Sequence, residues 1–99
     1  MMKHMHDRES LYRFLWNNRN QKNVVSMSQG DVAKTFGISY QRLSIVMSEF
    51  IDMGLVHKHK HEFLLRYNPN KIPWGEDFDK LRASYIAHKN KEKKNDSIN

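Results

Sequence analysis

Apolar residues recur at helical spacing in four stretches of this 99-residue chain, and polar segments separate the stretches. The first stretch predicts a helix that begins at Asp7, whose side chain suits an N-cap, and that ends before the polar residues 17–23. The second predicts a helix over residues 28–36 that begins with a serine cap. The last predicts a helix from Glu76 to about Lys91, with acidic residues at its start and lysines at its end, as the helix dipole favours.

The third stretch predicts a helix from Tyr40 to Met53, which follows the second helix after a tight turn. Gly37 suits the left-handed conformation that ends a helix, and Ser39 suits the N-cap of the next one. Gly54 then ends the third helix. Its apolar residues are three or four positions apart and predict one buried face made of Leu43, Val46, Met47 and Phe50.

Two further segments predict a small antiparallel sheet. Residues 24–27 begin with two β-branched side chains, which is typical of a short edge strand, and residues 55–67 alternate as a hairpin does. In an extended strand the three histidines within residues 57–61 share one face, and the two lysines between them share the other. The hairpin turn is expected near His61 and Glu62.

The order of these elements is a positioning helix, a turn, a second helix and a basic hairpin, which is the order of a winged helix-turn-helix domain. The predicted fold class is mainly α with a small β-hairpin (α+β): a winged helix-turn-helix with an additional C-terminal helix. One domain is expected over residues 7–89. A flexible segment at residues 1–6 precedes it, and a disordered basic tail at residues 90–99 follows it.

The formal net charge of +6 and the pI near 9.7 favour a polyanionic partner, of which double-stranded DNA is the most common. A chain of this size forms a small core, and it shows no signature of an enzyme, a cofactor or a small-molecule substrate. The sequence has no cysteine, no apolar run long enough to span a membrane and no signal-like N-terminus. A cytoplasmic, nucleoid-associated protein is therefore expected.

In a helix-turn-helix protein the N-terminal part of the second helix contacts base edges in the major groove. Gln41 matches the hydrogen-bonding edge of adenine, Arg42 matches that of guanine, and Ile45 could cover a thymine methyl group. The full set of candidate base contacts is Ser39, Tyr40, Gln41, Arg42, Ser44, Ile45 and Ser48.

Basic side chains in the hairpin and beside it are candidates for phosphate or minor-groove contacts. Residues 57–99 carry 10 basic and 6 acidic side chains, a net charge of +4, against 7 and 5, or +2, for residues 1–56. The hairpin and its surroundings are therefore expected to supply much of the attraction for phosphate. The candidates are Lys34, Lys58, His59, Lys60 and Arg66.

The charge of the helix predicted over residues 40–53 supports a different kind of partner. Between Tyr40 and Met53 one basic residue, Arg42, stands against Glu49 and Asp52, so this helix carries a net charge of −1. Such a helix attracts a phosphate backbone weakly. A winged-helix module that binds a host protein therefore remains the alternative to a DNA-binding protein.

The histidines of the hairpin raise the question of a metal site, because alternate imidazoles on a strand resemble zinc ligands. Glu62 is the one evident carboxylate beside them, and the hairpin tip is exposed in such folds. We expect no metal here. Instead, the histidines should gain positive charge below about pH 6.5 and tighten DNA binding.

Apolar residues of the last helix could form the seam of a homodimer, or they could complete the core of a monomer. A dimer would present two recognition helices about one turn of DNA apart. The residues concerned are Phe78, Leu81, Tyr85 and Ile86.

The turn Gly37-Ile38-Ser39 and the closing Gly54-Leu55-Val56 are similar to the winged helix-turn-helix pattern of bacterial regulators, including MarR-like proteins. The segment Arg66-Tyr67-Asn68-Pro69-Asn70, followed by Trp74-Gly75, resembles the end of the wing in RepL-type plasmid and phage replication or regulatory proteins. The tyrosine directly precedes Asn-Pro here, a register that differs from that family's. Positions 45 and 48, often basic in DNA-reading members, are Ile and Ser. The resemblance covers about residues 24–88 and implies a DNA-binding protein that acts in replication or transcriptional regulation.

Overall fold

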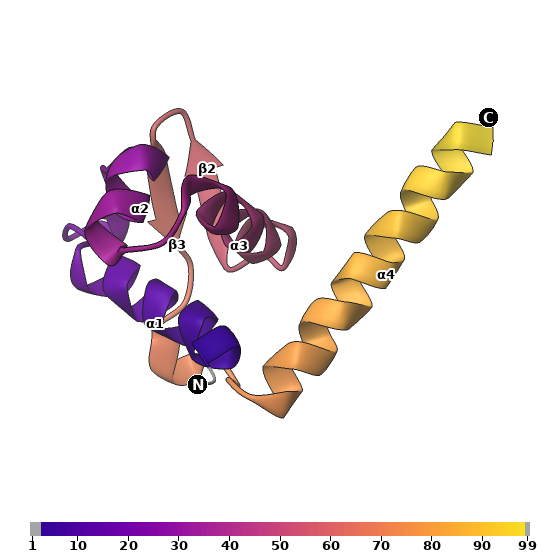
Figure 1. Cartoon of the computed structure of the whole chain (residues 1–99), viewed down its shortest axis with the longest axis horizontal. Helices are drawn as coiled ribbons and strands as arrows, with labels where there is room; N and C mark the ends of the chain where they lie inside the picture. Colours follow the sequence, from indigo (N-terminus) through magenta and orange to yellow (C-terminus); the bar gives the residue numbers. More distant parts are fainter. Residues whose placement is uncertain (1–2, 99) are drawn as a thin grey trace.

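The computed structural model describes residues 3–98 of the chain, with the side chains of residues 8–87. Its elements follow the predicted order, and Figure 1 shows the C-terminal helix extending from a small packed body. This confirms the winged helix-turn-helix with an additional helix. The elements are α1 (Lys3–Asn17), β1 (Val24–Val25), α2 (Gln29–Phe36), α3 (Tyr40–Asp52), β2 (Val56–His59), β3 (Glu62–Leu65), the 3-10 turn η1 (Pro69–Lys71) and α4 (Glu76–Ile98).

The helix-turn-helix is held by the capping residues that the sequence indicates. The Ser28 side chain accepts a hydrogen bond from the backbone N–H of Asp31 at 3.1 Å, which begins α2. Gly37 ends that helix with a φ of 92°, a left-handed conformation that glycine adopts without steric cost. The Ser39 side chain then accepts a hydrogen bond from the N–H of Arg42 at 3.1 Å and begins α3.

The sheet has three antiparallel strands in the order β1-β3-β2. The short strand β1 pairs with β3, which confirms the expected edge strand beside the hairpin. His59 pairs with Glu62, so the turn consists of Lys60 and His61 and comes one residue earlier than predicted. The hairpin sequence lacks the Asn-Gly or Asp-Gly pair that would have marked the turn. We call residues 56–65 the wing.

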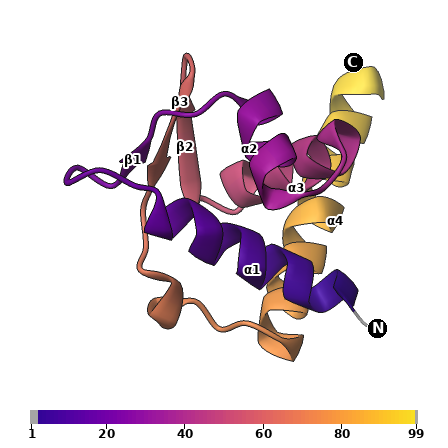
Figure 2. The same ribbon diagram turned by 60° about the vertical axis from the view of Figure 1, so that its left-hand side comes forward.

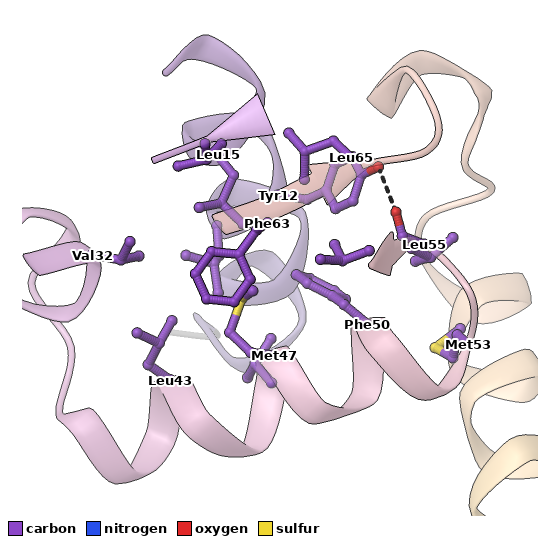
Figure 3. Packing of buried hydrophobic residues seen from close by; sticks show 14 of the residues in the cluster. Tyr12, Leu15, Val32, Leu43, Met47, Phe50, Met53, Leu55, Phe63 and Leu65 are labelled. Carbon is purple, nitrogen blue, oxygen red and sulfur yellow. Dashed lines mark hydrogen bonds between the residues drawn. The ribbon is translucent and has the colours of Figure 1, made fainter. Parts of the chain in front are cut away.

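The core lies between α1, α3 and the inner face of the sheet, as Figures 2 and 3 show. All four predicted inward residues of α3 are buried, among them Phe50 at 0% exposed. The sequence pattern missed Tyr12, which is also 0% exposed and packs edge-on against Phe50 with ring centroids 5.4 Å apart. Tyr12 is a phenol on the helix face that also buries Leu11 and Leu15.

The Tyr12 hydroxyl joins α1 to two distant segments of backbone. It donates a hydrogen bond to the carbonyl oxygen of Tyr67 at 2.7 Å and accepts one from the N–H of the same residue at 3.3 Å. The carbonyl oxygen of Leu55 is 3.4 Å away, as drawn in Figure 3. Burial raises the pKa of the Tyr12 phenol above its usual 10.0, and the hydrogen bond with Tyr67 partly offsets that rise.

Both terminal helices are longer than the sequence predicts. α1 begins at Lys3 instead of Asp7, and α4 continues to Ile98 instead of ending near Lys91. Neither extension contains glycine or proline, and a possible cap does not oblige a helix to begin there. Residues 3–6 and 90–98, expected to be flexible, are therefore drawn as helix, while residues 1, 2 and 99 of the same two segments lie outside the described residues.

Candidate nucleic-acid interface

The surface of α3 that faces away from the core is a stripe of polar and apolar side chains. Gln41, Ile45, Ser48 and Asp52 are exposed and lie three or four positions apart, opposite the buried face. Ile45 is 54% exposed, which the core does not explain, although a large aliphatic side chain usually packs. In DNA-bound helix-turn-helix proteins the second helix of the motif faces the major groove, and this stripe is the exposed face of that helix here.

The other predicted base-contact residues lie beside that stripe, and they differ in how far they are exposed and in whether they already form a hydrogen bond. Tyr40 is 56% exposed at the start of α3. Arg42 and Ser44 are half-buried on opposite flanks of the helix. Ser39 is exposed, but its hydroxyl already caps α3, so its first role is structural.

Glu49, one of the two acidic residues that lower the net charge of α3, has partners within the chain. Glu49 accepts hydrogen bonds from Arg8 of α1 at 2.7 and 3.3 Å and from Arg82 of α4 at 3.1 Å. Its side chain is 12% exposed, on the flank of α3 that faces those two helices. The two arginines offset its charge, and the first two and a half turns of α3, residues 40–48, carry Arg42 and no acidic residue. The net charge of −1 therefore misrepresents the surface that faces outward.

A groove of about 290 Å³ joins the start of α3 to the wing. It is lined by the first residues of α2, by Tyr40 and by the tip of the wing, including Lys58 and Lys60. The Lys58 ammonium is 3.4 Å from the Gln29 side-chain oxygen and lies over the Phe63 ring. Two lysines thus stand beside the exposed end of α3, next to backbone N–H groups at the start of α2.

The remaining predicted phosphate contacts are more dispersed. Lys34 is exposed on α2 outside that groove. Arg66 follows β3 at the base of the wing, where its N–H donates to the carbonyl of Leu55 at 2.9 Å. Four strand residues separate it from the tip, about 13 Å of extended chain. The structure therefore groups Lys58 and Lys60 with Tyr40 and leaves Lys34, His59 and Arg66 as separate positions.

The strand register separates the histidines from the lysine beside them. His57 pairs with half-buried Leu64 on the outer face, while Lys58 pairs with buried Phe63 on the inner face, as alternation predicts. His59 is on the outer face and His61 lies in the turn. Within the part of the chain that the structure describes, no three His, Cys, Asp or Glu side chains gather closely enough to hold a metal ion.

The predicted dimer seam divides into one buried residue and three exposed ones. Phe78 is 2% exposed and stacks on Trp74 with ring centroids 4.8 Å apart, so it belongs to the core of its own chain and is removed from the seam. Leu81, Tyr85 and Ile86 are exposed at 43%, 41% and 39%.

Among the helices drawn for residues 3–98, none has the length and apolar character needed to cross a lipid bilayer. The comparison with curated proteins and the comparison with solved structures each found no match. The family model for the Firmicute plasmid replication protein (RepL) matches residues 5–99, nearly the whole chain. That span includes the helix-turn-helix, the wing and the Asn-Pro segment, and the chain belongs to the RepL family of plasmid replication proteins.

Proposed function

We propose that this RepL-family protein acts in plasmid replication by binding double-stranded DNA, with α3 in the major groove and the wing on the backbone. The observation that carries the proposal is the exposed end of α3, which lacks acidic residues over 40–48 and adjoins the groove with Lys58 and Lys60. Base edges would be contacted from α3 and phosphates from the wing. Such a protein would be associated with plasmid DNA in the nucleoid.

Three side chains of α3 are assigned to base recognition. Gln41 is exposed and matches adenine, and the half-buried Arg42 matches guanine in a bidentate geometry. Ile45 supplies an apolar contact of the kind that a thymine methyl group offers. The two wing lysines add attraction that does not depend on the base sequence.

A protein partner for α3 remains the competing function, but its main support was the acidic character of the helix. Because Glu49 is bonded to Arg8 and Arg82, half of that acidic character is accounted for inside the chain. We therefore favour DNA, in a role that involves no catalysis.

Selection from a random duplex DNA library, followed by binding measurements at several salt concentrations, tests this function. The protein should enrich one short motif and discriminate against a changed base pair by roughly 5- to 150-fold. Arg42→Ala should relax the preference at one position. Lys58→Ala with Lys60→Ala should weaken all sequences alike and reduce the slope of log affinity against log salt by about 2.

Lys80→Ala is the matched control, because Lys80 is an exposed lysine of α4 outside the wing. It should change neither the motif nor its affinity by more than about twofold. Failure to enrich any motif, with binding to random duplexes as weak for the wild type as for the wing double variant, would reject the proposal.

A further inference from the structure

One of the three histidines in the wing does not lie where the sequence pattern places it. Alternation along a strand predicts one face for His57, His59 and His61. In the structure β2 ends at His59, and the next residue, Lys60, has a left-handed φ of 55°. The turn therefore interrupts the alternation after His59, and His61 is released from the outer face of the sheet.

His61 lines the groove of about 290 Å³ between the wing tip and the start of α3, which we call the wing groove. The residue is exposed, so a ligand in this groove can reach its imidazole ring. His57 is also exposed, but it pairs with Leu64 on the outer face and is not part of the groove wall. One histidine therefore differs from the others in the surface that it faces.

The charged side chains that share the wing groove with His61 are cationic. Lys58 and Lys60 line it from the wing. α3 contributes Tyr40, whose phenolic hydroxyl can donate a hydrogen bond, and α2 contributes the uncharged residues 28–30. The groove thus gathers donors and positive charge from three elements.

The nearby acidic side chains lie outside the wing groove. Glu62 follows His61 in the sequence, but its carboxylate accepts a hydrogen bond from the Ser26 hydroxyl at 3.3 Å. Asp31 is exposed on the first turn of α2. Among the residues that the structure describes, no acidic side chain lines the groove. The wing groove is therefore suited to a small anionic group.

We propose that the wing groove binds a backbone phosphate of DNA and that protonation of His61 strengthens this contact in mildly acidic solution. This role rests on the proposed DNA binding. An imidazole ring ordinarily gains a proton below about pH 6.5, whereas a phosphodiester keeps its negative charge. A protonated His61 supplies a third cation beside Lys58 and Lys60, and its N–H groups can form a charge-assisted hydrogen bond with a phosphate oxygen. The affinity for duplex DNA should therefore rise as the pH falls.

The histidines of the outer face carry the same kind of ring, but on the other side of the sheet. Their charge would act on a phosphate in the wing groove only across the sheet or through solvent, where salt at about 0.1 M screens charges over about 10 Å. His57 and His59 should therefore contribute little to the pH dependence. This separates a single phosphate contact from a general increase in positive charge.

The affinity of the full chain for a labelled random-sequence duplex, measured by fluorescence anisotropy at about pH 8 and at about pH 5.5, tests this role. In about 0.1 M salt the wild type should bind about three- to tenfold more tightly at the lower pH, and the slope of log affinity against log salt should steepen by about 1. His61→Ala should lose most of both changes. His61→Lys carries a fixed charge, so at the higher pH it should bind about as tightly as the wild type does at the lower pH.

His57→Ala is the matched control, because it removes the same side chain from an exposed position on the outer face. It should keep the pH difference of the wild type and the change in salt slope. Circular dichroism should be the same for all four proteins at both pH values.

Three outcomes would contradict the role of His61. One is an equal pH difference in His61→Ala and the wild type, and another is an equal loss in His57→Ala and His61→Ala. A wild type that binds the duplex equally at both pH values also overturns the role, while DNA binding itself stands. A wild type that binds no duplex at either pH overturns the proposed function and the phosphate site together.

Discussion

The body of this protein, α1 to η1, differs sharply from the two parts that leave it, the wing tip and α4. In the body, apolar side chains are buried, and the charged residue Glu49 is bonded to Arg8 of α1 and to Arg82 near the start of α4. At the wing tip, residues 57–62 are all exposed and include two lysines and three histidines. In α4, residues 83–87 are exposed and include Tyr85 and Ile86.

The two projecting parts expose opposite chemistries. The wing tip presents cations next to the polar stripe of α3, whereas α4 presents apolar rings and chains next to an apolar groove. Residues that pack within the chain are explained by folding alone, but residues held outside the body are not. This difference is the reason why the proposed polyanion is placed at the wing and α3 and not at α4.

The largest expected effect separates the body from α4 by stability. Phe50→Ala should lower the free energy of unfolding by about 3–5 kcal/mol, because it removes a fully buried ring and leaves a cavity. Leu81→Ala should cost less than about 1 kcal/mol, because that side chain is 43% exposed. Urea unfolding followed by circular dichroism measures both values.

The loss for Phe50→Ala should be the same at low and at high protein concentration, because it arises from packing within one chain. Equal losses for the two variants in dilute solution would show that α4 belongs to the body.

The next largest effect is expected from the hydrogen bonds between the Tyr12 hydroxyl and the backbone of Tyr67 inside the body. Tyr12→Phe removes the hydrogen bonds that join α1 to the backbone of Tyr67, and it should cost about 1–2 kcal/mol near neutral pH. The raised pKa of Tyr12 gives this tie a pH dependence. In the unfolded chain the phenol ionises near 10, while in the folded chain it stays neutral to higher pH.

Stability from Tyr12 is therefore complete below pH 10 and declines as the pH rises through 10 toward the folded pKa. The wild type should lose stability over this interval faster than Tyr12→Phe. Plots of the free energy of unfolding against pH should therefore converge for the two proteins. Tyr85→Phe is the control, because Tyr85 is 41% exposed, and it should leave the alkaline dependence unchanged. A constant gap between wild type and Tyr12→Phe up to pH 11 contradicts the assignment.

The features predicted correctly from the sequence are those set by neighbouring residues. Serine caps, the left-handed Gly37 and the spacing of the α3 core depend on residues within one or two turns. The alternation of the wing likewise followed from a period of two. These local rules are enough for the winged helix-turn-helix order.

The features that escaped prediction depend on partners far along the chain. Tyr12 is buried because Tyr67 satisfies its hydroxyl 55 residues later. By its position in the sequence, Glu49 counts as an exposed acidic residue. Its partners Arg8 and Arg82 are 41 and 33 positions away, so local spacing does not indicate them. Phe78 was assigned to the same seam as Leu81, since helical spacing shows which residues share a face but not what covers them. Gln41, Ile45 and Ser48 are exposed, as their positions on α3 predict, and the charge counted from the sequence overlooked the partners of Glu49. Contact of this surface with DNA stays a prediction.

The smallest effect on stability is expected from a substitution at the tip of the wing. This substitution separates the contribution of Lys60 to folding from its contribution to DNA binding. Lys60 has a φ of 55°, a left-handed conformation that Asn adopts more readily than Lys. Lys60→Asn should therefore leave the domain as stable as before or raise its free energy of unfolding by a few tenths of a kcal/mol. The same change removes one of the two lysines at the groove beside α3. It should weaken binding to every duplex and lower the salt slope by about 1.

The contrast to measure is that between the free energy of unfolding and the affinity for DNA. If Lys60 served the fold alone, Lys60→Asn would lower both together. Lys71→Asn is the comparison, since Lys71 is an exposed lysine that lines the groove beside α4, whereas Lys60 lines the groove beside α3. It should leave the salt slope unchanged. If Lys60→Asn preserved DNA affinity while it stabilised the turn, the wing tip would lie away from the phosphates. The polyanion surface would then be confined to α3 and its near neighbours.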